Sequence, residues 1–132
     1  MDQRQVFDVL VIGSGAAGLA VALSVADSAK VAVLSKDTLA SGSTRWAQGG
    51  IAAVLDSADS IKAHIADTLN AGAGLCNYNA VRHTVENSTD AINWLIEQQV
   101  QFSKDSNNKY HLTKEGGHSH RRIIHAADAT GV

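Results

Sequence analysis

The stretch that decides the fold runs from Phe7 to Gly18 and reads FDVLVIGSGAAG. Its first half, residues 7–12, is short, almost continuously apolar and rich in β-branched side chains, which is typical of a parallel strand buried on both faces. Its second half has the spacing G-x-G-x-x-G, with glycine at positions 13, 15 and 18. The stretch therefore predicts a strand that ends in a tight, glycine-rich turn.

The residues after this turn complete a strand–helix–strand unit. Leu19, Leu23 and Ala26 repeat at helical spacing within residues 16–28, and residues 30–35 form a second short apolar run. Two such strands joined by a helix within about thirty residues form a βαβ unit with a right-handed crossover. The fold class expected is α/β, with a Rossmann-like nucleotide-binding domain.

The glycine-rich turn has the chemistry of a dinucleotide site. Gly13 permits the tight turn, Gly15 lets the backbone approach a pyrophosphate, and Gly18 lets the helix pack on the strand. Amide groups at the start of the helix would bind the phosphates. A tight turn without a ligand is the alternative, but the strand and helix on either side favour dinucleotide binding. The other residues of this candidate site are Ser14, Ala16 and Ala17.

The end of the second strand departs from the usual dinucleotide fingerprint. An acidic residue about 20 positions after the glycines normally holds the adenosine ribose, whereas this chain has Ser35 and Lys36 there. Ser35 offers a hydroxyl but is not an ionised double acceptor. Lys36 is expected either to face ribose or phosphate oxygens or to be a solvated strand end. The missing acid weakens an interpretation as an NAD site.

A second cluster of small and polar residues, 41–53, reads SGSTRWAQGGIAA. Small residues let a flat ligand approach the main chain, and Ser43, Thr44 and Gln48 add donors of the kind a flavin ring needs. The alternative is a disordered Gly/Ser loop, against which Trp46 and the apolar residues 51–54 argue. The long loop at residues 37–50 is therefore expected to be functional.

The remaining local patterns predict helices and a hairpin. They are a helix from Asp59–Ser60 to Gly72, a helical stretch over residues 79–99 with a candidate break near Ser88, and a turn at Asn107–Asn108. Residues 98–102 are a candidate strand. Residues 126–131 look like the start of a further helix.

A dense polar cluster, residues 115–122, reads EGGHSHRR. A metal site built on His118, His120 and His125 matches common ligand sets poorly, because neither Cys nor paired carboxylates accompany them. Arg121 and Arg122 could instead bind a dicarboxylate through charge-assisted hydrogen bonds, and a solvated basic loop is the plain alternative. For His120 and Arg121, a role toward substrate and internal pairing both stay open. Glu115 could pair with a substrate amino group.

Three motifs together resemble a known family. GSTRWAQGGIAAV, preceded by GSGAAG and followed by EGGHSHRRIIHAADATG, is similar to L-aspartate oxidase. This family comprises the FAD enzymes of bacterial NAD synthesis and is related to the flavoprotein subunits of succinate dehydrogenase and fumarate reductase. The resemblance runs the length of the chain. It implies an α/β, Rossmann-like FAD-binding domain that is incomplete, with residues 1–132 as its N-terminal part and the capping domain missing.

The resemblance also implies roles for individual residues. Ser14 to Ala17 would bind the FAD pyrophosphate, and Lys36 would lie on the adenosine side. Ser43 replaces the histidine that covalently holds the flavin in the membrane-bound relatives, so FAD is expected to be non-covalent. Glu115 would orient the amino group of L-aspartate. The residues that would hold the flavin and pyrophosphate are Ser43, Thr44, Arg45, Trp46, Ala47, Gln48, Gly49 and Gly50.

The activity implied is oxidation of L-aspartate to iminoaspartate, with hydride passing from the substrate Cα to flavin N5 and oxygen or fumarate reoxidising the flavin. The resemblance also implies a functional link to quinolinate synthase. A soluble fumarate reductase or succinate dehydrogenase-like flavoprotein is one alternative. A non-catalytic nucleotide-binding module is another.

Composition bounds the function classes further. A net charge of −2 over 132 residues argues against binding to nucleic acid or to an anionic membrane. No apolar run reaches the roughly 18 residues of a membrane span. The single cysteine, Cys76, cannot form an internal disulfide and fits a reducing cytoplasm. We expect it to be a small buried residue.

Overall fold

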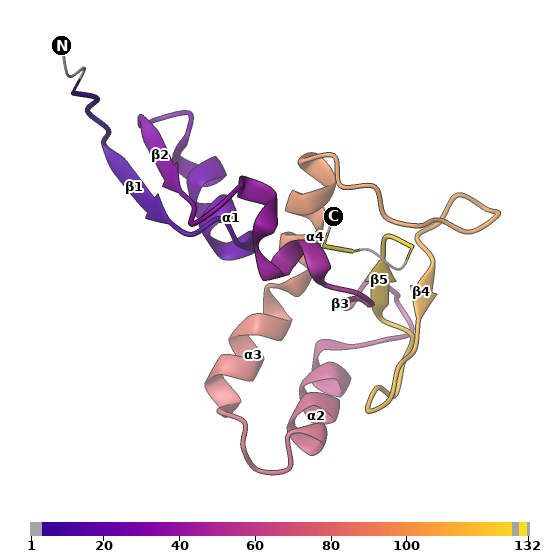
Figure 1. The fold of residues 1–132 in the computed structure, drawn as a ribbon. Helices are drawn as coiled ribbons and strands as arrows, with labels where there is room; N and C mark the ends of the chain where they lie inside the picture. The colour runs from indigo at the N-terminus through magenta and orange to yellow at the C-terminus, as the bar shows by residue number, and fades with distance from the viewer. Residues whose placement is uncertain (1–3, 128–129, 132) are drawn as a thin grey trace. The chain divides into compact units, whose positions relative to one another are not determined.

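A computed structural model describes residues 4–127 and 130–131 of the chain (Figure 1). The chain divides into two compact units. Unit 1 comprises Met1–Ala47 with Gly131–Val132, and unit 2 comprises Gln48–Thr130. Among the described residues, no helix is long and apolar enough to cross a membrane.

Unit 1 is a βαβ unit (Figure 1). Strand β1 (Val9–Ile12) pairs in parallel with β2 (Val31–Leu34), and helix α1 (Ala16–Val25) connects them. The register places Val9 opposite Val31. The α/β class and the parallel pairing predicted from the sequence are therefore confirmed.

The ends of these elements are set by local hydrogen bonds. Asp8 accepts the Lys30 amide with its carboxylate at 2.8 Å and donates its own amide to the Lys30 carbonyl at 2.9 Å. This closes the strand pair just before the first ladder partners. Ala29 donates its amide to the Val25 carbonyl at 2.9 Å, in the turn that follows α1. Both strands and the helix are consequently shorter than the predicted segments.

Strand β1 alternates in burial along the chain, whereas β2 is half-buried from Val31 to Val33 and exposed at Leu34. Val11 is buried, whereas Leu10 and Ile12 are 61% and 79% exposed. The expectation of a strand buried on both faces is therefore wrong for this chain. The physical reason is that α1 covers the face to which Val11 points, and the side chains of alternate strand residues point to the opposite face.

Unit 2 combines a small antiparallel sheet with three helices. Strand β5 (Ile123–His125) lies between β3 (Gly50–Ala52) and β4 (Leu112–Thr113). Its helices are α2 (Ile61–Ala71), α3 (Tyr78–Glu86) and α4 (Ser88–Glu97), with α2 packed beside α3 (Figure 1). The buried core residues are Ala53, Ile92, Phe102 and Ile124.

Helix ends in unit 2 follow the predicted capping residues. Ser60 is the N-cap of α2, and its hydroxyl accepts the Ala63 amide at 3.1 Å; Gly72 ends the helix. Asn87 separates α3 from α4, so the predicted break near Ser88 is confirmed. The Asn107–Asn108 turn is also confirmed, since Lys104 and Tyr110 form an antiparallel bridge across it.

Three expectations need correction or refinement. Residues 98–102 do not form a strand: Gln98 and Gln99 lie in a turn, where Gln99 has a left-handed φ of 68°, and Phe102 packs in the core. The helix expected at residues 126–131 is not found in its described part, where Ala127 has a φ of 48°; residues 128–129 lie outside the described residues. The loop at residues 37–50 holds two single 3₁₀ turns, Leu39–Ser41 and Ser43–Trp46.

Candidate functional site

The glycine-rich turn of unit 1 joins the end of β1 to the start of α1. Gly13 has a φ of +111°, a conformation that favours glycine, and its amide donates to the Leu34 carbonyl at 2.9 Å. A Cβ at Gly18 would overlap the Gly13 carbonyl oxygen and lie 3.2 Å from Val11 Cγ1. The close approach of α1 to β1 therefore requires glycine at position 18.

Side chains from β2 and from the following loop reach this turn. The hydroxyls of Ser14 and Ser35 lie 3.0 Å apart, which links the turn to the end of β2. Thr44 Oγ1 accepts the amide of Ala16, in the first turn of α1, at 3.0 Å. The first amides of a helix have no partner within the helix and attract anions. A segment 28 residues downstream thus supplies an oxygen where an anion would bind.

A cleft of about 640 Å³ lies over the turn. Its walls are the turn itself, residues 35–37 after β2, which include the acidic Asp37, and residues 41–44. Backbone amides, hydroxyls and the Lys36 ammonium are donors for phosphate and ribose oxygens. The structure therefore brings the predicted residues Gly13 to Gly15, Lys36, Ser43 and Thr44 to one cleft whose donor set fits an anionic diphosphate.

The rest of the candidate flavin segment is divided between the two units. Trp46, at the end of the 3₁₀ turn in unit 1, is 75% exposed, and Arg45 is also exposed. Ala47 accepts the Gly131 amide at 3.2 Å. Gln48, Gly49 and Gly50 belong to unit 2, where Gly50 opens β3.

In unit 2 the structure places Glu115 beside Gly49. Both line a cavity of about 230 Å³ together with Thr113, His125 and Ala127. Gly49 has a φ of +74°, and a Cβ there would lie 3.8 Å from Glu115 Oε1. The exposed carboxylate of Glu115, which can only accept hydrogen bonds, thus lies next to Gly49, which has no side chain to cover the backbone.

Two histidines form a pair at this cavity. His125 Nδ1 lies 3.1 Å from the Ala127 carbonyl, and its Nε2 lies 2.9 Å from His111 Nδ1. A carbonyl can only accept, so this contact assigns a proton to His125 Nδ1. A neutral His125 ring then accepts at Nε2, with His111 Nδ1 as the donor. Both ring nitrogens of His125 are therefore engaged within the protein.

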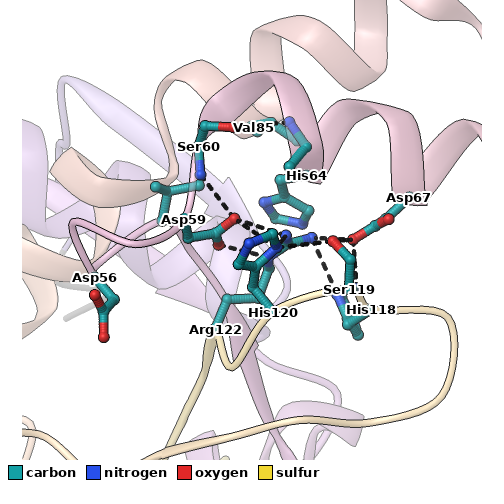
Figure 2. A network of polar contacts seen from close by, with 12 residues as sticks. Asp56, Asp59, Ser60, His64, Asp67, Val85, His118, Ser119, His120 and Arg122 are labelled. Carbon is teal, nitrogen blue, oxygen red and sulfur yellow. Dashed lines mark hydrogen bonds and ion pairs between the residues drawn. The ribbon is translucent and has the colours of Figure 1, made fainter.

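Arg122 is the centre of a buried ionic network (Figure 2). Its guanidinium donates to both carboxylate oxygens of Asp59, at 2.7 Å and 2.8 Å, and to Asp67 Oδ2 at 2.8 Å. The arginine is fully buried, and the Asp59 side chain is only 1% exposed. The expectation that Arg122 could bind a dicarboxylate is therefore wrong, because two internal carboxylates already occupy it.

The neighbouring polar residues also pair internally. His120 Nδ1 lies 3.4 Å from Asp59 Oδ1 and 2.8 Å from the Ser119 hydroxyl. Arg121 donates to the Leu112 carbonyl at 3.4 Å. For His120 and Arg121 the structure thus favours internal pairing over a role toward substrate. Within residues 4–127 and 130–131, no group of three or more metal-ligating side chains comes together.

The network shifts the pKa values of its members. Burial by itself raises the pKa of Asp59, but hydrogen bonds from Arg122 and the Ser60 amide outweigh it and lower that pKa. Hydrogen bonds from the Ser119 hydroxyl and amide, with Arg122 beside them, lower the pKa of Asp67 to about 2. Burial and the charge of Arg122 lower the pKa of His64. Both carboxylates are therefore ionised around the arginine at neutral pH.

Sequence reasoning did not single out Asp59 or Asp67 as partners of Arg122. The sequence predicts a role for Asp59 only at the start of a helix. The available signal is that an arginine in a core needs carboxylates, and these two acids flank the first two turns of the same predicted helix. Neither that signal nor any spacing rule identifies the contact of Thr44 with Ala16.

Comparisons with known proteins agree with this geometry. Residues 8–132 match the family model described as FAD binding domain. The chain is 60% identical to L-aspartate oxidase of Pseudomonas aeruginosa over 100% of its length, and 57% identical to that of Vibrio cholerae over 99%. It covers 26% and 25% of those proteins, so it spans about a quarter of the length of these relatives.

Solved structures give the same result for the fold. E. coli quinol fumarate reductase superposes with a TM-score of 0.88 at 31% identity, covering 95% of this chain and 22% of that one. Mycobacterium smegmatis Sdh1 superposes with a TM-score of 0.86 at 30% identity and the same coverage. The match to the family model over residues 8–132 shows that the chain belongs to the FAD-binding-domain family, whose cofactor is FAD, and the donors around the cleft of unit 1 fit the diphosphate of that cofactor.

Proposed function

We propose that this chain is the N-terminal part of the FAD-binding domain of an enzyme that oxidises L-aspartate to iminoaspartate. The observation that carries the proposal is the placement of Glu115 beside Gly49 in one cavity. A carboxylate there suits a substrate that bears an ammonium group. Succinate and fumarate have no such group and would gain nothing from it.

Two segments of the chain would bind different parts of FAD. Gly13 to Gly18 and Lys36 would hold the FAD pyrophosphate and adenosine, and the segment from Ser43 to Gly50 would hold the flavin. Ser43 carries a hydroxyl, which makes no covalent flavin link, so the cofactor is bound non-covalently. FAD supplies the hydride acceptor when it is bound.

Glu115 would orient the substrate through its amino group. Formation of iminoaspartate removes a hydride from Cα and a proton from the amino group. The electrons pass in the end to oxygen, giving hydrogen peroxide, or to fumarate, giving succinate. Glu115 would fix the amino group, and with it the direction of the Cα–H bond.

The test uses the full-length protein with its flavin under anaerobic conditions. L-Aspartate should bleach the flavin absorbance, and the absence of bleaching would reject the proposal. Glu115→Gln should reduce aspartate oxidation far more than fumarate reduction. Equal losses in the two reactions would refute the role of Glu115.

A fumarate reductase-like flavoprotein is the second candidate, favoured by the structural similarity to E. coli quinol fumarate reductase. A preference for succinate or fumarate over aspartate in steady-state assays would decide for it.

The main proposal also includes the location and the use of the product. The enzyme would work in the cytoplasm, in keeping with its single cysteine. Its product would feed quinolinate synthase in NAD biosynthesis.

A further inference from the structure

The turn that carries Glu115 rests on helix α2. The Glu115 carbonyl accepts the His118 amide at 3.3 Å, and Gly117 has a φ of +83°, so residues 115–118 form a β-turn. A Cβ on Gly117 would lie 3.5 Å from the Ala71 Cβ, in ordinary van der Waals contact. The turn therefore lies against the last turn of α2.

Asp67, one helical turn before Ala71, binds the segment directly after this β-turn. Its Oδ2 accepts the Ser119 amide at 2.7 Å, the Ser119 hydroxyl at 2.7 Å and the Arg122 guanidinium at 2.8 Å (Figure 2). Three donors on one ionised oxygen make a strong, directional anchor. Asp59, just before α2, holds the rest of the same guanidinium.

The sheet fixes the two residues on either side of the loop of residues 114–121, which carries Glu115 and Ser119. The Arg122 amide donates to the Thr113 carbonyl at 3.1 Å, and Thr113 lies opposite Ile123 in the ladder. Glu115 thus leaves β4 two residues after a fixed point. Between Glu115 and Ser119 lie two glycines, whose backbone has little conformational restriction of its own. The conformation of this turn, and with it the position of Glu115, therefore depends on what fixes its two ends, which are Thr113 in the sheet and Ser119 on Asp67.

We infer that Asp67 is a positioning residue that holds Glu115 in its cavity beside Gly49 and thereby sets the preference for a substrate with an amino group. This inference rests on the proposed function. Asp67 touches neither the cavity nor a reacting atom. It acts through Ser119 and through the β-turn of residues 115–118.

The experiment compares full-length holoenzymes in two reactions. Asp67→Asn keeps the size of the side chain but removes the charge and one acceptor. We expect its KM for L-aspartate to rise about tenfold, since small displacements of a substrate-positioning group cost one to two orders of magnitude. The KM for fumarate and the bound FAD content should not change. Asp27→Asn, at an exposed position after α1, is the matched control and should leave both reactions unchanged.

A double-mutant cycle separates positioning from a general structural role. In a Glu115→Gln background there is no carboxylate to position, so adding Asp67→Asn should raise the KM for aspartate little further. Ser119→Ala keeps the backbone hydrogen bond and the ion pair, and should give the same selective effect at smaller amplitude. It also serves if Asp67→Asn fails to fold.

The outcomes are distinguishable. Equal effects on aspartate and fumarate, or a full effect of Asp67→Asn in the Glu115→Gln background, would overturn the role of Asp67. Unchanged aspartate kinetics in both Asp67→Asn and Ser119→Ala would do so too. If the unmodified enzyme oxidises no aspartate, the proposed function itself fails, and this is seen before any variant is made.

Discussion

Replacing Arg122 by methionine should destabilise unit 2 strongly. Methionine fills much of the arginine volume, but it leaves the Asp59 carboxylate, only 1% exposed, without its partner. Removing one member of a buried ion pair costs about 3–5 kcal/mol, because the other charge stays buried. Asp67 adds less to this cost, since its side chain is 19% exposed and keeps the hydrogen bonds from Ser119. We therefore expect a loss of about 4 kcal/mol.

Urea unfolding at pH 7 measures this loss. With an m-value of about 2 kcal/mol/M, a loss of about 4 kcal/mol lowers the midpoint by roughly 2 M. Trp94 on α4 is partly buried in unit 2, whereas Trp46 of unit 1 is mostly exposed, so the fluorescence change of residues 1–132 reports mainly unit 2. Far-UV circular dichroism should show the same transition.

A surface pair on the same unit gives the control. Arg82 lies 3.8 Å from Glu86 on α3, and both side chains are about half exposed. Such pairs contribute only about 0.3–0.5 kcal/mol, so Arg82→Met should lower the midpoint by roughly 0.2 M. Adding Asp59→Asn to Arg122→Met removes the stranded buried charge and should recover part of the loss. If Arg122→Met shifted the midpoint no more than Arg82→Met, the network would contribute no more than a surface pair.

Two further predictions concern the anchor at Asp67 and the glycine-rich turn. The folded-state pKa of Asp67, about 2, lies below its ordinary value of 3.8; the carboxylate therefore stabilises the fold above about pH 4, and this contribution is lost as the pH falls toward 2. The stability difference between the wild type and Asp67→Asn in urea titrations should shrink over that range; a constant difference would contradict the assignment. Gly18→Ala places a Cβ against the Gly13 carbonyl oxygen, and overpacking of this kind costs about 1–3 kcal/mol and moves α1 from β1. Flavin absorbance of the purified protein should show that FAD is lost, while Val21→Ala, on an exposed position of α1, retains it.

The βαβ unit could be predicted because its signals are local. The apolar run at β1, the spacing of Gly13, Gly15 and Gly18, and the second apolar run each restrict the backbone within a few residues. Ser60 and Gly72 marked the ends of α2 for the same reason, since capping depends on groups three or four positions away. The burial of β1 could not be predicted from its pattern alone, because burial depends on what covers each face of the sheet.

The partners of the polar residues 115–122 could not be predicted from their spacing in the sequence. Arg122 meets Asp59 and Asp67 only because α2 and the β4–β5 hairpin fold together, across separations of 63 and 55 residues. The pairing of β3 with β5 likewise joins distant segments, with Ile51 opposite Ile124. A charged residue can be read from the sequence, whereas its partner depends on which segments pack together.

The sequence by itself determined the strand–turn–helix–strand unit and the types of residue that can hold a dinucleotide, because backbone preferences and hydrophobic periodicity act over short distances. Only the tertiary structure decided which charged side chains near the C-terminus are buried in ion pairs and which are exposed to a ligand. It buried Arg122 between two carboxylates and left Glu115 exposed beside Gly49. The physical reason is the cost of burying a charge: a buried arginine requires ionised partners, whereas Glu115, which stays exposed, needs none.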